Sequence, residues 1–561
     1  MEEKSFFENI RIAYFSMEIG IDDRIPTYSG GLGVLAGDTL RSAADLGIPM
    51  VGVSLLYKKG YFKQRITKKG EQIEEEVVWE PSKFLKQLDT KVMVKIRERV
   101  VWIKPWLYTI KGTTGKELPI IFMDTDIAEN TPYDRTLTHY LYGYDEEYRL
   151  CQEVVLGIGG VRMLEKIGCK NIKKYHMNEG HSGLLAIELC RRYGKRDDCI
   201  EKVREQCVFT THTPVPAGHD QFNKNFAIDI LGENLPEWLY NKVFFEDRLN
   251  MTYLGLIFSK YINGVAKKHG EVARGMFPGY HIESITNGVH TAFWASPYMK
   301  QLFEKYIPEC LCDPFNLRYI MSVPKKEVWD AHKKAKAELI RFVNENYNVG
   351  MDEEVFTIGF ARRAATYKRG DLLFSDIGRL IRIAEKTKGL QIIYSGKAHP
   401  KDTGGKEVIR RIIEAMQQLE NKIKACYIED YSIKIAKLLV AGVDLWVNTP
   451  QRPMEASGTS GMKAAINGVP QFSTLDGWWL EGHIENVTGW SIGIHPNQKK
   501  ESEQAEDVLD FYRKLEHVIL PKYYNERDNW IEIMRHVIAL NGSFFNTHRM
   551  LQQYVLNAYF K

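Results

Sequence analysis

The sequence predicts an α/β protein built from two doubly wound domains, in each of which helices cover a parallel sheet. Apolar runs of strand length alternate with amphipathic helical stretches along the chain, a pattern typical of parallel sheets joined by helices. The length of 561 residues exceeds what one hydrophobic core usually holds, so two domains are expected. Loops rich in glycine or basic residues directly follow predicted strands, where such sheets bind ligands.

The secondary-structure elements follow from the spacing of apolar residues. Short apolar runs predict strands at 12–17, 50–56, 208–211, 355–360, 391–395 and 444–447. Amphipathic stretches predict helices at 35–46, 184–193, 326–344 and 407–420. Strands and helices therefore alternate in both halves of the chain.

The expected domains are residues 1–280 and 281–561, with a glycine- and proline-containing crossover at Arg274–Tyr280. Residues 64–123, which begin with a stretch rich in Lys, Glu and Val, predict an antiparallel β insertion that decorates the first domain. The helices from about residue 507 onward have no further sheet to cover, which allows them to pack back on the first domain. Ligands in such sheets bind beyond the carboxyl ends of strands, so we predict an active site in the cleft between the domains.

Composition excludes several classes of function. The formal charge of +4 is too close to balance to indicate binding to nucleic acid or to a membrane surface. The eight cysteines include one close pair, Cys310 and Cys312, with no second pair to complete a zinc site, and His176, His181 and His219 match no metal motif. We therefore expect no metal. No signal-like segment and no run of about 18 apolar residues is present, so a cytoplasmic protein is expected.

The most informative segment runs from Glu455 to Lys463, where a carboxylate, a loop of small residues and one lysine follow each other. Small residues let a backbone approach a ligand, and successive amides can hold an oxyanion. A lysine just inside the next helix would lie against the same pocket, where desolvation could make its amine a nucleophile toward an aldehyde. A plain strand-to-helix loop with a solvated lysine would show the same pattern.

The segment Ser29-Gly30-Gly31-Leu32-Gly33 predicts an anion site, because it lies between a strand and the start of a helix. Its spacing differs from that of dinucleotide-binding loops, which argues against a nicotinamide cofactor. A tight turn is the simpler alternative.

The basic segment Arg362–Arg369 follows the strand predicted at 355–360. Several cations at the carboxyl end of a strand can hold a phosphate dianion, although a solvated basic surface is the alternative. His212 ends another apolar strand, and His181 lies in Glu179-Gly180-His181-Ser182. A histidine at the end of a strand is more often structural than catalytic, so pattern alone leaves both open.

Together these motifs resemble those of the α-glucan phosphorylases, the family of glycogen, starch and maltodextrin phosphorylases. The segment that ends in Lys463 is similar to the pyridoxal phosphate lysine motif of that family, with Ser460-Gly461 in place of Gly-Asn. Trp478-Trp479 replaces Ala-Asn farther along, and both differences fit the short, mainly prokaryotic branch. The resemblance covers nearly the whole chain. It implies two Rossmann-like domains that face each other across a cleft, the glycosyltransferase-B architecture.

The resemblance also implies a role for each residue that matches a family motif. The residues implied in catalysis are Lys463, Arg363, Lys368 and His212. The residues implied in binding pyridoxal 5'-phosphate are Lys463, Thr459, Ser460, Arg362, Gly31 and Tyr431. The residues implied in binding substrate are Gly30, His181, Asn287, Glu455, Ser457 and Gly458.

The activity implied is that of a retaining α-1,4-glucan phosphorylase, an enzyme that uses inorganic phosphate to release the non-reducing terminal glucose of glycogen or maltodextrin as α-glucose 1-phosphate. The phosphate group of pyridoxal phosphate would exchange a proton with the substrate phosphate. The partners are therefore an α-1,4-glucan and phosphate, and a homo-oligomer remains open. The first motif lies within the first twenty residues, so the allosteric control found in long members, including N-terminal phosphorylation, is not expected.

Three alternative functions fit parts of this pattern. A nucleotide-sugar-dependent α-glucan synthase shares the architecture but has no use for a cofactor lysine. An aminotransferase-like pyridoxal enzyme would use the lysine as a base within a single cofactor domain. A non-catalytic glucan-binding protein would not need Lys463, Arg363, Lys368 and Glu455 together.

Overall fold

The computed structural model describes residues 6–143, 145–195, 198–215, 218–419, 422–495 and 503–560. The chain forms two compact units with mixed α/β structure. Unit 1 consists of Met1–Phe62, Glu76–Thr286 and Met550–Lys561, and unit 2 consists of Lys63–Glu75 and Asn287–Arg549. The division at Thr286 comes after the boundary expected at residue 280, because the short strand β15 (Glu283–Ser284) pairs with a strand of unit 1.

Unit 1 is built on a ten-stranded sheet with the order β15-β14-β10-β9-β1-β2-β8-β7-β5, in which β6 also pairs with β7. The strands from β15 to β8 are parallel, whereas β5, β6 and β7 form an antiparallel edge. The strand bounds are β1 Ile12–Ser16, β2 Met50–Leu55, β5 Lys86–Gln87, β6 Val92–Ile96, β7 Arg99–Lys111, β8 Glu117–Asp124, β9 Lys174–Asn178, β10 Cys207–Thr210 and β14 Tyr261–Gly264.

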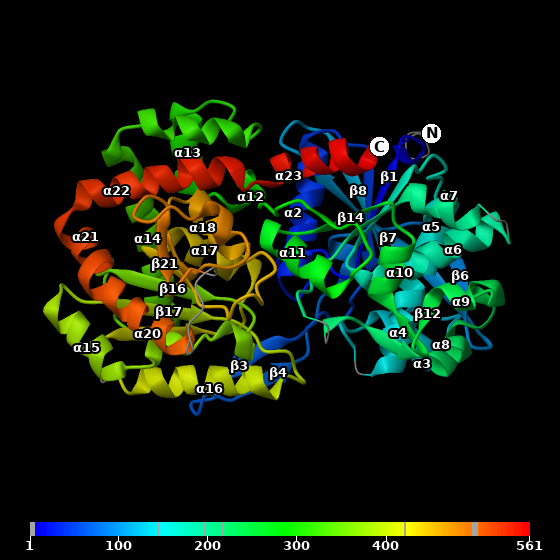
Figure 1. Ribbon diagram of the computed structural model, residues 1–561, viewed down its shortest axis with the longest axis horizontal. Coiled ribbons are helices and arrows are strands. Elements are labelled where there is room, and N and C mark those ends of the chain that lie inside the picture. Colours follow the sequence, from blue (N-terminus) through cyan, green and yellow to red (C-terminus); the bar gives the residue numbers. More distant parts are fainter. Residues whose placement is uncertain are drawn as a thin grey trace. The chain divides into compact units, whose positions relative to one another are not determined.

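Helices cover both faces of this sheet (Figure 1), as the alternation of side chains along β1 demonstrates. Ile12 and Tyr14 pack in a core with α2 (Gly31–Asp45). Ala13 and Phe15 point to the opposite face and pack in a second core with α4 (Glu146–Val154), α5 (Gly160–Lys166) and α6 (Leu184–Tyr193). Successive residues of a strand point to opposite faces, so a wholly apolar strand needs a core on each side.

Unit 2 is built on a six-stranded sheet with the order β18-β17-β16-β19-β20-β21, all parallel. The strand bounds are β16 Thr357–Ala361, β17 Gln391–Ser395, β18 Lys424–Ile428, β19 Leu445–Asn448, β20 Gln471–Thr474 and β21 Gly489–Ile492. Counted along the chain this order is that of a Rossmann fold, and its direction reverses between β16 and β19. Ligands of such sheets bind outside the carboxyl ends of the strands at this reversal.

The helices of unit 2 include α14 (Lys325–Tyr347), α15 (Ile377–Lys386), α16 (Thr403–Gln417), α17 (Ile433–Gly442), α18 (Ser460–Ile466) and α20 (Glu503–Lys514). A buried ion pair fixes α14 to the central strands. Lys336 of α14 donates to the Asp444 carboxylate at 2.6 Å, and Thr357 donates its N–H to the same group at 2.8 Å. This contact sets how α14 lies against β16 and β19.

The region expected as one antiparallel insertion divides between the two units. The hairpin of β3 (Lys63–Ile66) and β4 (Gln72–Glu75) belongs to unit 2, while β8 continues the main parallel sheet of unit 1. The reason lies in two glutamines whose amides satisfy backbone groups of unit 2. Gln64 donates to the Gly396 carbonyl at 2.8 Å, and Gln72 exchanges hydrogen bonds with Ala398 at 2.9 Å.

Most predicted elements are confirmed to within a few residues. The strand predicted at 391–395 is β17, and the helix predicted at 184–193 is α6. The helix predicted at 407–420 is α16, although Glu420 lies outside the described residues. The helix predicted at 35–46 begins earlier, at Gly31, so the glycine loop itself forms its first turn. None of the helices in the described ranges is both long and apolar enough to cross a lipid bilayer.

Candidate functional site

Residues singled out in the sequence gather at the carboxyl ends of the parallel strands in each unit. We call those of unit 1 the glycine-loop site, comprising Gly30, Gly31, His181 and His212 with their neighbour Glu18. We call those of unit 2 the lysine site, comprising Arg362, Arg363, Lys368, Glu455 and Lys463. Each site is described within its own unit.

A protein carboxylate holds the start of the glycine loop. Glu18, which follows β1, accepts hydrogen bonds from the amides of Ser29 at 2.5 Å and Gly30 at 3.1 Å. Its other oxygen accepts a hydrogen bond from the Tyr142 hydroxyl at 2.7 Å. The amides of the first turn of a helix have no acceptor within the helix, so Gly31 is better placed than Gly30 to offer its N–H to an anion.

The glycine loop has open space beside its first two glycines, where a ligand could approach the backbone. A Cβ atom on Gly30 or Gly31 would meet nothing within 4 Å. A Cβ atom on Gly33 would lie 2.7 Å from the Glu18 carboxylate, so Gly33 is needed for packing. The pattern of glycines predicted the loop, whereas the role of Glu18 depends on a contact that local sequence does not encode.

His212, the second residue after β10, is held as a neutral ring by its surroundings. Its Nε2 lies 2.7 Å from the Asn178 amide oxygen, and its backbone N–H donates to Glu179 at 2.7 Å. Burial, with a smaller effect of the nearby His269, lowers the pKa of His212 to about 3. An amide oxygen only accepts hydrogen bonds, so Nε2 carries the ring proton and Nδ1 is left as an acceptor.

His181 lies beside the partly buried Arg149 and two carboxyl groups. Its Nε2 is 3.6 Å from the Asp220 carboxylate, which also accepts from Arg149 at 2.9 Å. Burial lowers the pKa of His181 to about 3, and Arg149 adds to the effect. Burial raises the pKa of the neighbouring Glu153 well above its ordinary value. Among the described residues, His181 Nδ1 has no hydrogen-bond partner and is a polar atom able to bind a ligand.

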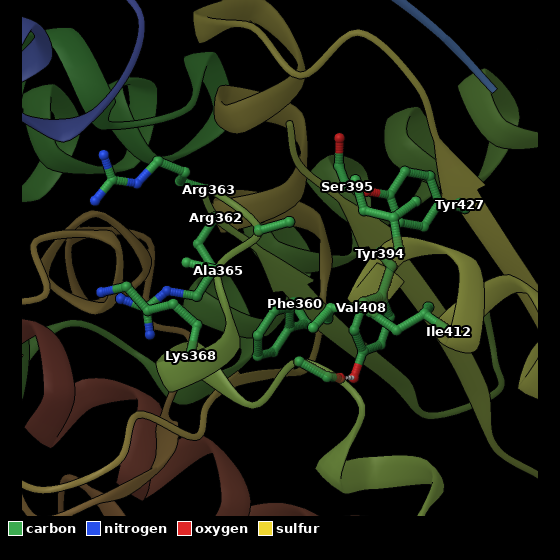
Figure 2. Close-up of a pocket in the computed structure, with 13 residues that line it drawn as sticks. Phe360, Arg362, Arg363, Ala365, Lys368, Tyr394, Ser395, Val408, Ile412 and Tyr427 are labelled. Atoms are coloured by element: carbon green, nitrogen blue, oxygen red, sulfur yellow. Dashed lines mark hydrogen bonds between the residues drawn. The ribbon is translucent and has the colours of Figure 1, made fainter. Parts of the chain in front are cut away.

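In the lysine site, two cations converge on one carboxylate oxygen. Glu455 Oε2 accepts hydrogen bonds from Arg362 at 2.5 Å and from Lys368 at 2.6 Å. Figure 2 shows these two side chains running toward the same region, whereas Arg363 extends in a different direction. Burial raises the pKa of Glu455, but the two cations outweigh it and bring the value to about 2. The sequence predicted Arg362, Lys368 and Glu455 as site residues but not that Arg362 and Lys368 share one oxygen of Glu455.

The same positive charge acts on two neighbouring tyrosines. Burial alone would raise the pKa of Tyr367, yet Lys368, whose amine lies 4.5 Å from its ring centre, shifts it below the ordinary value. Burial raises the pKa of Tyr431, and the charge of Arg362 opposes that rise. Phe360, Val408 and Ile412 line a small pocket with Arg362 and Lys368 (Figure 2), and these apolar walls strengthen the electrostatic interactions.

Lys463 lies in the first turns of α18 and is only 6% exposed. Its amine lies 4.0 Å from the centre of the Trp294 ring, a residue that the sequence did not indicate. Ser460 accepts a hydrogen bond from the Trp446 indole at 3.1 Å. A Cβ atom on Gly461 would lie 1.4 Å from the Gln471 side-chain oxygen and 3.0 Å from the Trp478 ring, so a larger residue would require the Gln471 side chain to move.

The surroundings of Lys463 suit a cofactor that carries an aldehyde and a phosphate group. A buried primary amine, a loop of small residues and a nearby guanidinium are the groups that such a molecule needs. Within the described part of the chain, Ser457 Oγ, Asn287 Oδ1 and two nitrogens of Arg362 are buried without hydrogen-bond partners. Buried polar atoms are normally satisfied, so these atoms indicate polar ligands. The free nitrogens of Arg362 fit the phosphate of the cofactor, and Ser457 and Asn287 keep polar atoms for another ligand.

Asp476 is a further member of this site that sequence analysis did not select. Its carboxylate accepts the N–H of Glu455 at 2.8 Å and that of Gly477 at 2.9 Å. Burial raises its pKa to about 7, and the negative charge of Glu455 adds to the rise. An Asp-Gly pair after a strand usually signals a turn, so the sequence offered no reason to place it in the site.

The chain is similar to known proteins over nearly its whole length. The model of the family described as carbohydrate phosphorylase matches residues 27–150 and 240–506. The maltodextrin phosphorylase of Thermococcus litoralis is 39% identical, over 98% of this chain and 70% of that protein. The glycogen phosphorylase of Aquifex aeolicus is 34% identical, over 98% of this chain and 86% of its own. An uncharacterized protein of Methanocaldococcus jannaschii is 32% identical, over 98% of this chain and 99% of its own.

Proposed function

The chain belongs to the carbohydrate phosphorylase family, and from that premise we propose that it is a retaining α-1,4-glucan phosphorylase. It uses inorganic phosphate to release the non-reducing terminal glucose of glycogen or maltodextrin as α-glucose 1-phosphate. The names of relatives that align over 98% of this chain support the choice of an α-glucan as substrate.

The observation that best supports a phosphate substrate is the convergence of Arg362 and Lys368 on Glu455. Two buried cations share one carboxylate at the reversal of strand order, which leaves the group with a net positive charge. Charge-assisted contacts of Arg and Lys are the strongest way to hold a phosphate dianion. Lys368 and Arg363 bind the substrate phosphate in this proposal. Glu455, with Ser457, Gly458 and Asn287, binds glucose hydroxyls.

The cofactor proposed for the lysine site is pyridoxal 5'-phosphate, which Lys463 would bind through its amine. Thr459, Ser460, Arg362, Gly31 and Tyr431 are the residues proposed to hold it. When bound, pyridoxal phosphate supplies a phosphate group that donates and regains a proton near neutral pH. The cationic residues of the chain keep that phosphate and the substrate phosphate close together despite their charges.

The histidines of unit 1 orient the sugar without adding charge. Positive charge develops on the glucose ring as the glycosidic bond breaks, and a neutral His212 does not oppose it. Asn178 keeps the ring of His212 in one orientation, with Nδ1 as an acceptor. Gly30 and His181 complete the set of groups proposed to bind the substrate.

We further propose that the two units are the two Rossmann-like domains of a glycosyltransferase-B architecture and act on one glucan end in the cleft between them. Membership of the family supports this arrangement. Retention of configuration follows because phosphate enters on the face from which the glucan leaves.

Product analysis tests the proposal. The protein is incubated with maltodextrin and inorganic phosphate, without any nucleotide, and proton NMR is used to identify the sugar phosphate. We expect α-glucose 1-phosphate. The matched reaction contains a nucleotide sugar and maltodextrin but no phosphate, and we expect no chain extension. Activity only in the second reaction would assign the protein as a synthase, and a β-configured product would contradict retention.

A further inference from the structure

We propose that Asp476 is a positioning residue that fixes the backbone of Glu455, so that its carboxylate reaches Arg362, Lys368 and the sugar. This inference rests on the proposed function and adds a residue to which no substrate contact is assigned. Asp476 is 3% exposed and lies in the turn between β20 and α19 (Trp479–Gly482). Glu455 lies in the loop between β19 and α18. The proposal therefore concerns how one loop of unit 2 holds another.

The carboxylate of Asp476 joins the two loops with both of its oxygens. Oδ2 accepts the N–H of Glu455 at 2.8 Å, and Oδ1 accepts the N–H of Gly477 at 2.9 Å. Neither amide belongs to a helix or a strand. A buried amide without an acceptor loses the hydrogen bond that it would make to water in the unfolded chain, so the position of the Glu455 backbone depends on this side chain.

Direct backbone contacts hold the two loops in one register. The Trp478 amide donates to the Ser457 carbonyl at 2.9 Å. Gly477 has φ +54, and a side chain there would collide with the same carbonyl of Ser457. Gly458 has φ +87 and packs against the Trp478 ring. Positive φ and close approach both require glycine, so the two loops fit together in one register. Asp476 adds the hydrogen bond between the loops at Glu455.

The charges that face Asp476 show why its geometry matters. Glu455 faces it from the neighbouring loop and raises its pKa, while Lys368, from the segment after β16, lowers it. Burial has the largest effect on this carboxyl. A shift of the Glu455 backbone would move the Glu455 carboxylate away from both Arg362 and Lys368. Misplacing a catalytic contact by about 1 Å costs on the order of 10²-fold in rate.

A double-mutant cycle tests whether Asp476 acts through Glu455. The four proteins are wild type, Asp476→Asn, Glu455→Gln and the double variant, and kcat and KM are measured for phosphate and maltodextrin. We expect Asp476→Asn to lower kcat on the order of 10²-fold with a smaller change in KM for phosphate. In the Glu455→Gln background the same change should lower kcat less than about threefold, because residues that act as one unit are not additive.

The matched control is Thr474→Val. Thr474 is buried two residues before Asp476, and its hydroxyl donates to the Pro450 carbonyl at 2.8 Å. Losing this hydrogen bond weakens the contact between the same two chain segments without removing a contact of Glu455. We expect a lower melting temperature and kcat within about threefold of wild type, as for an uncoupled site. A kcat loss in Thr474→Val equal to that in Asp476→Asn would mean that any loosening of the loops suffices, which overturns the proposal.

Two further measurements keep the test decisive. If Asp476→Asn does not fold, Asp476→Glu, which keeps the charge but lengthens the side chain, should give the same dependence on Glu455. Equal losses of kcat in both backgrounds would overturn the proposal. An inactive wild type would contradict the proposed function instead. The urea unfolding midpoints of the same four proteins would then test the coupling between Asp476 and Glu455. We expect Asp476→Asn to lower the midpoint less in the Glu455→Gln background than in wild type.

Discussion

Lys368 donates to the same carboxylate oxygen of Glu455 that Arg362 contacts, at 2.6 Å and 2.5 Å. The two cations lie on the segment after β16, and the carboxylate lies on the loop after β19. These strands are neighbours in the sheet although the residues are far apart in the sequence. The group therefore links the two sides of the strand-order reversal and carries one more positive than negative charge.

Replacing Glu455 with Gln should destabilise the protein, because two buried cations lose their partner. The free energy of unfolding at pH 7, measured in urea, should fall by about 3–5 kcal/mol. Saturating phosphate should restore part of the loss, since an anion that binds only the folded state stabilises it.

The control for this change is Glu407→Gln, which breaks an exposed pair with Arg410. Surface pairs contribute about 0–1 kcal/mol, so its effect should be small. A loss for Glu455→Gln no larger than for the control would show that the convergence of the two cations has little energetic weight.

Arg362→Ala and Arg363→Ala should differ, although the residues are adjacent. Arg362→Ala removes a partner of Glu455 and should lower the urea midpoint. Arg363→Ala leaves the contact of Glu455 with Lys368 intact; it should mainly raise KM for phosphate and slow turnover on the order of 10²–10³-fold. Phosphate saturation curves and urea unfolding of both variants measure these effects. If Arg363→Ala changes neither turnover nor phosphate saturation, that side chain belongs to a basic surface.

Lys463→Ala should abolish both phosphorolysis and the near-ultraviolet absorbance of pyridoxal phosphate, while circular dichroism stays that of the wild type. Lys463→Arg, which keeps a cation beside Trp294, should lose them too, because the proposal requires a primary amine. The control is Lys437→Ala, since this lysine also lies over an aromatic ring, 3.5 Å from the centre of Phe293, and should be dispensable for the absorbance. Cofactor absorbance retained in Lys463→Ala would remove the assignment of this lysine.

The stability of the protein should depend on Asp476 between about pH 4 and pH 7. Burial raises its pKa from 3.8 to about 7, so in this window the folded state binds more protons than the unfolded state. The contribution of Asp476 to the free energy of unfolding then falls as pH rises, by about 4 kcal/mol at most, and levels off about one pH unit above the folded-state pKa. Glu455 stays ionised in this window because its pKa is about 2.

Melting temperatures of wild type and Asp476→Asn across pH 4–8 measure this effect. The variant does not titrate at this position, so wild type should lose stability relative to it as pH rises to about 7. A difference between the two proteins that is independent of pH would contradict the raised pKa.

Much of the fold could be predicted from the sequence because it rests on local patterns. The apolar run at 391–395 is a strand, and the amphipathic stretch at 184–193 is a helix, since both follow from the period of their apolar residues. The hairpin at Lys63–Glu75 could not be assigned to unit 2 in this way. Its place depends on Gln64 and Gln72 satisfying backbone groups more than 300 residues away.

The sequence by itself determined which loops carry the chemistry. Glycines before a helix, cations after a strand and a lysine after small residues each have a physical role that is visible in a few neighbouring positions. Only the tertiary structure decided which of these groups meet. Strand order brings Glu455 to Arg362 and Lys368, and loop packing places Asp476 against the Glu455 backbone. Such contacts depend on burial and on neighbours distant along the chain, which local sequence does not encode.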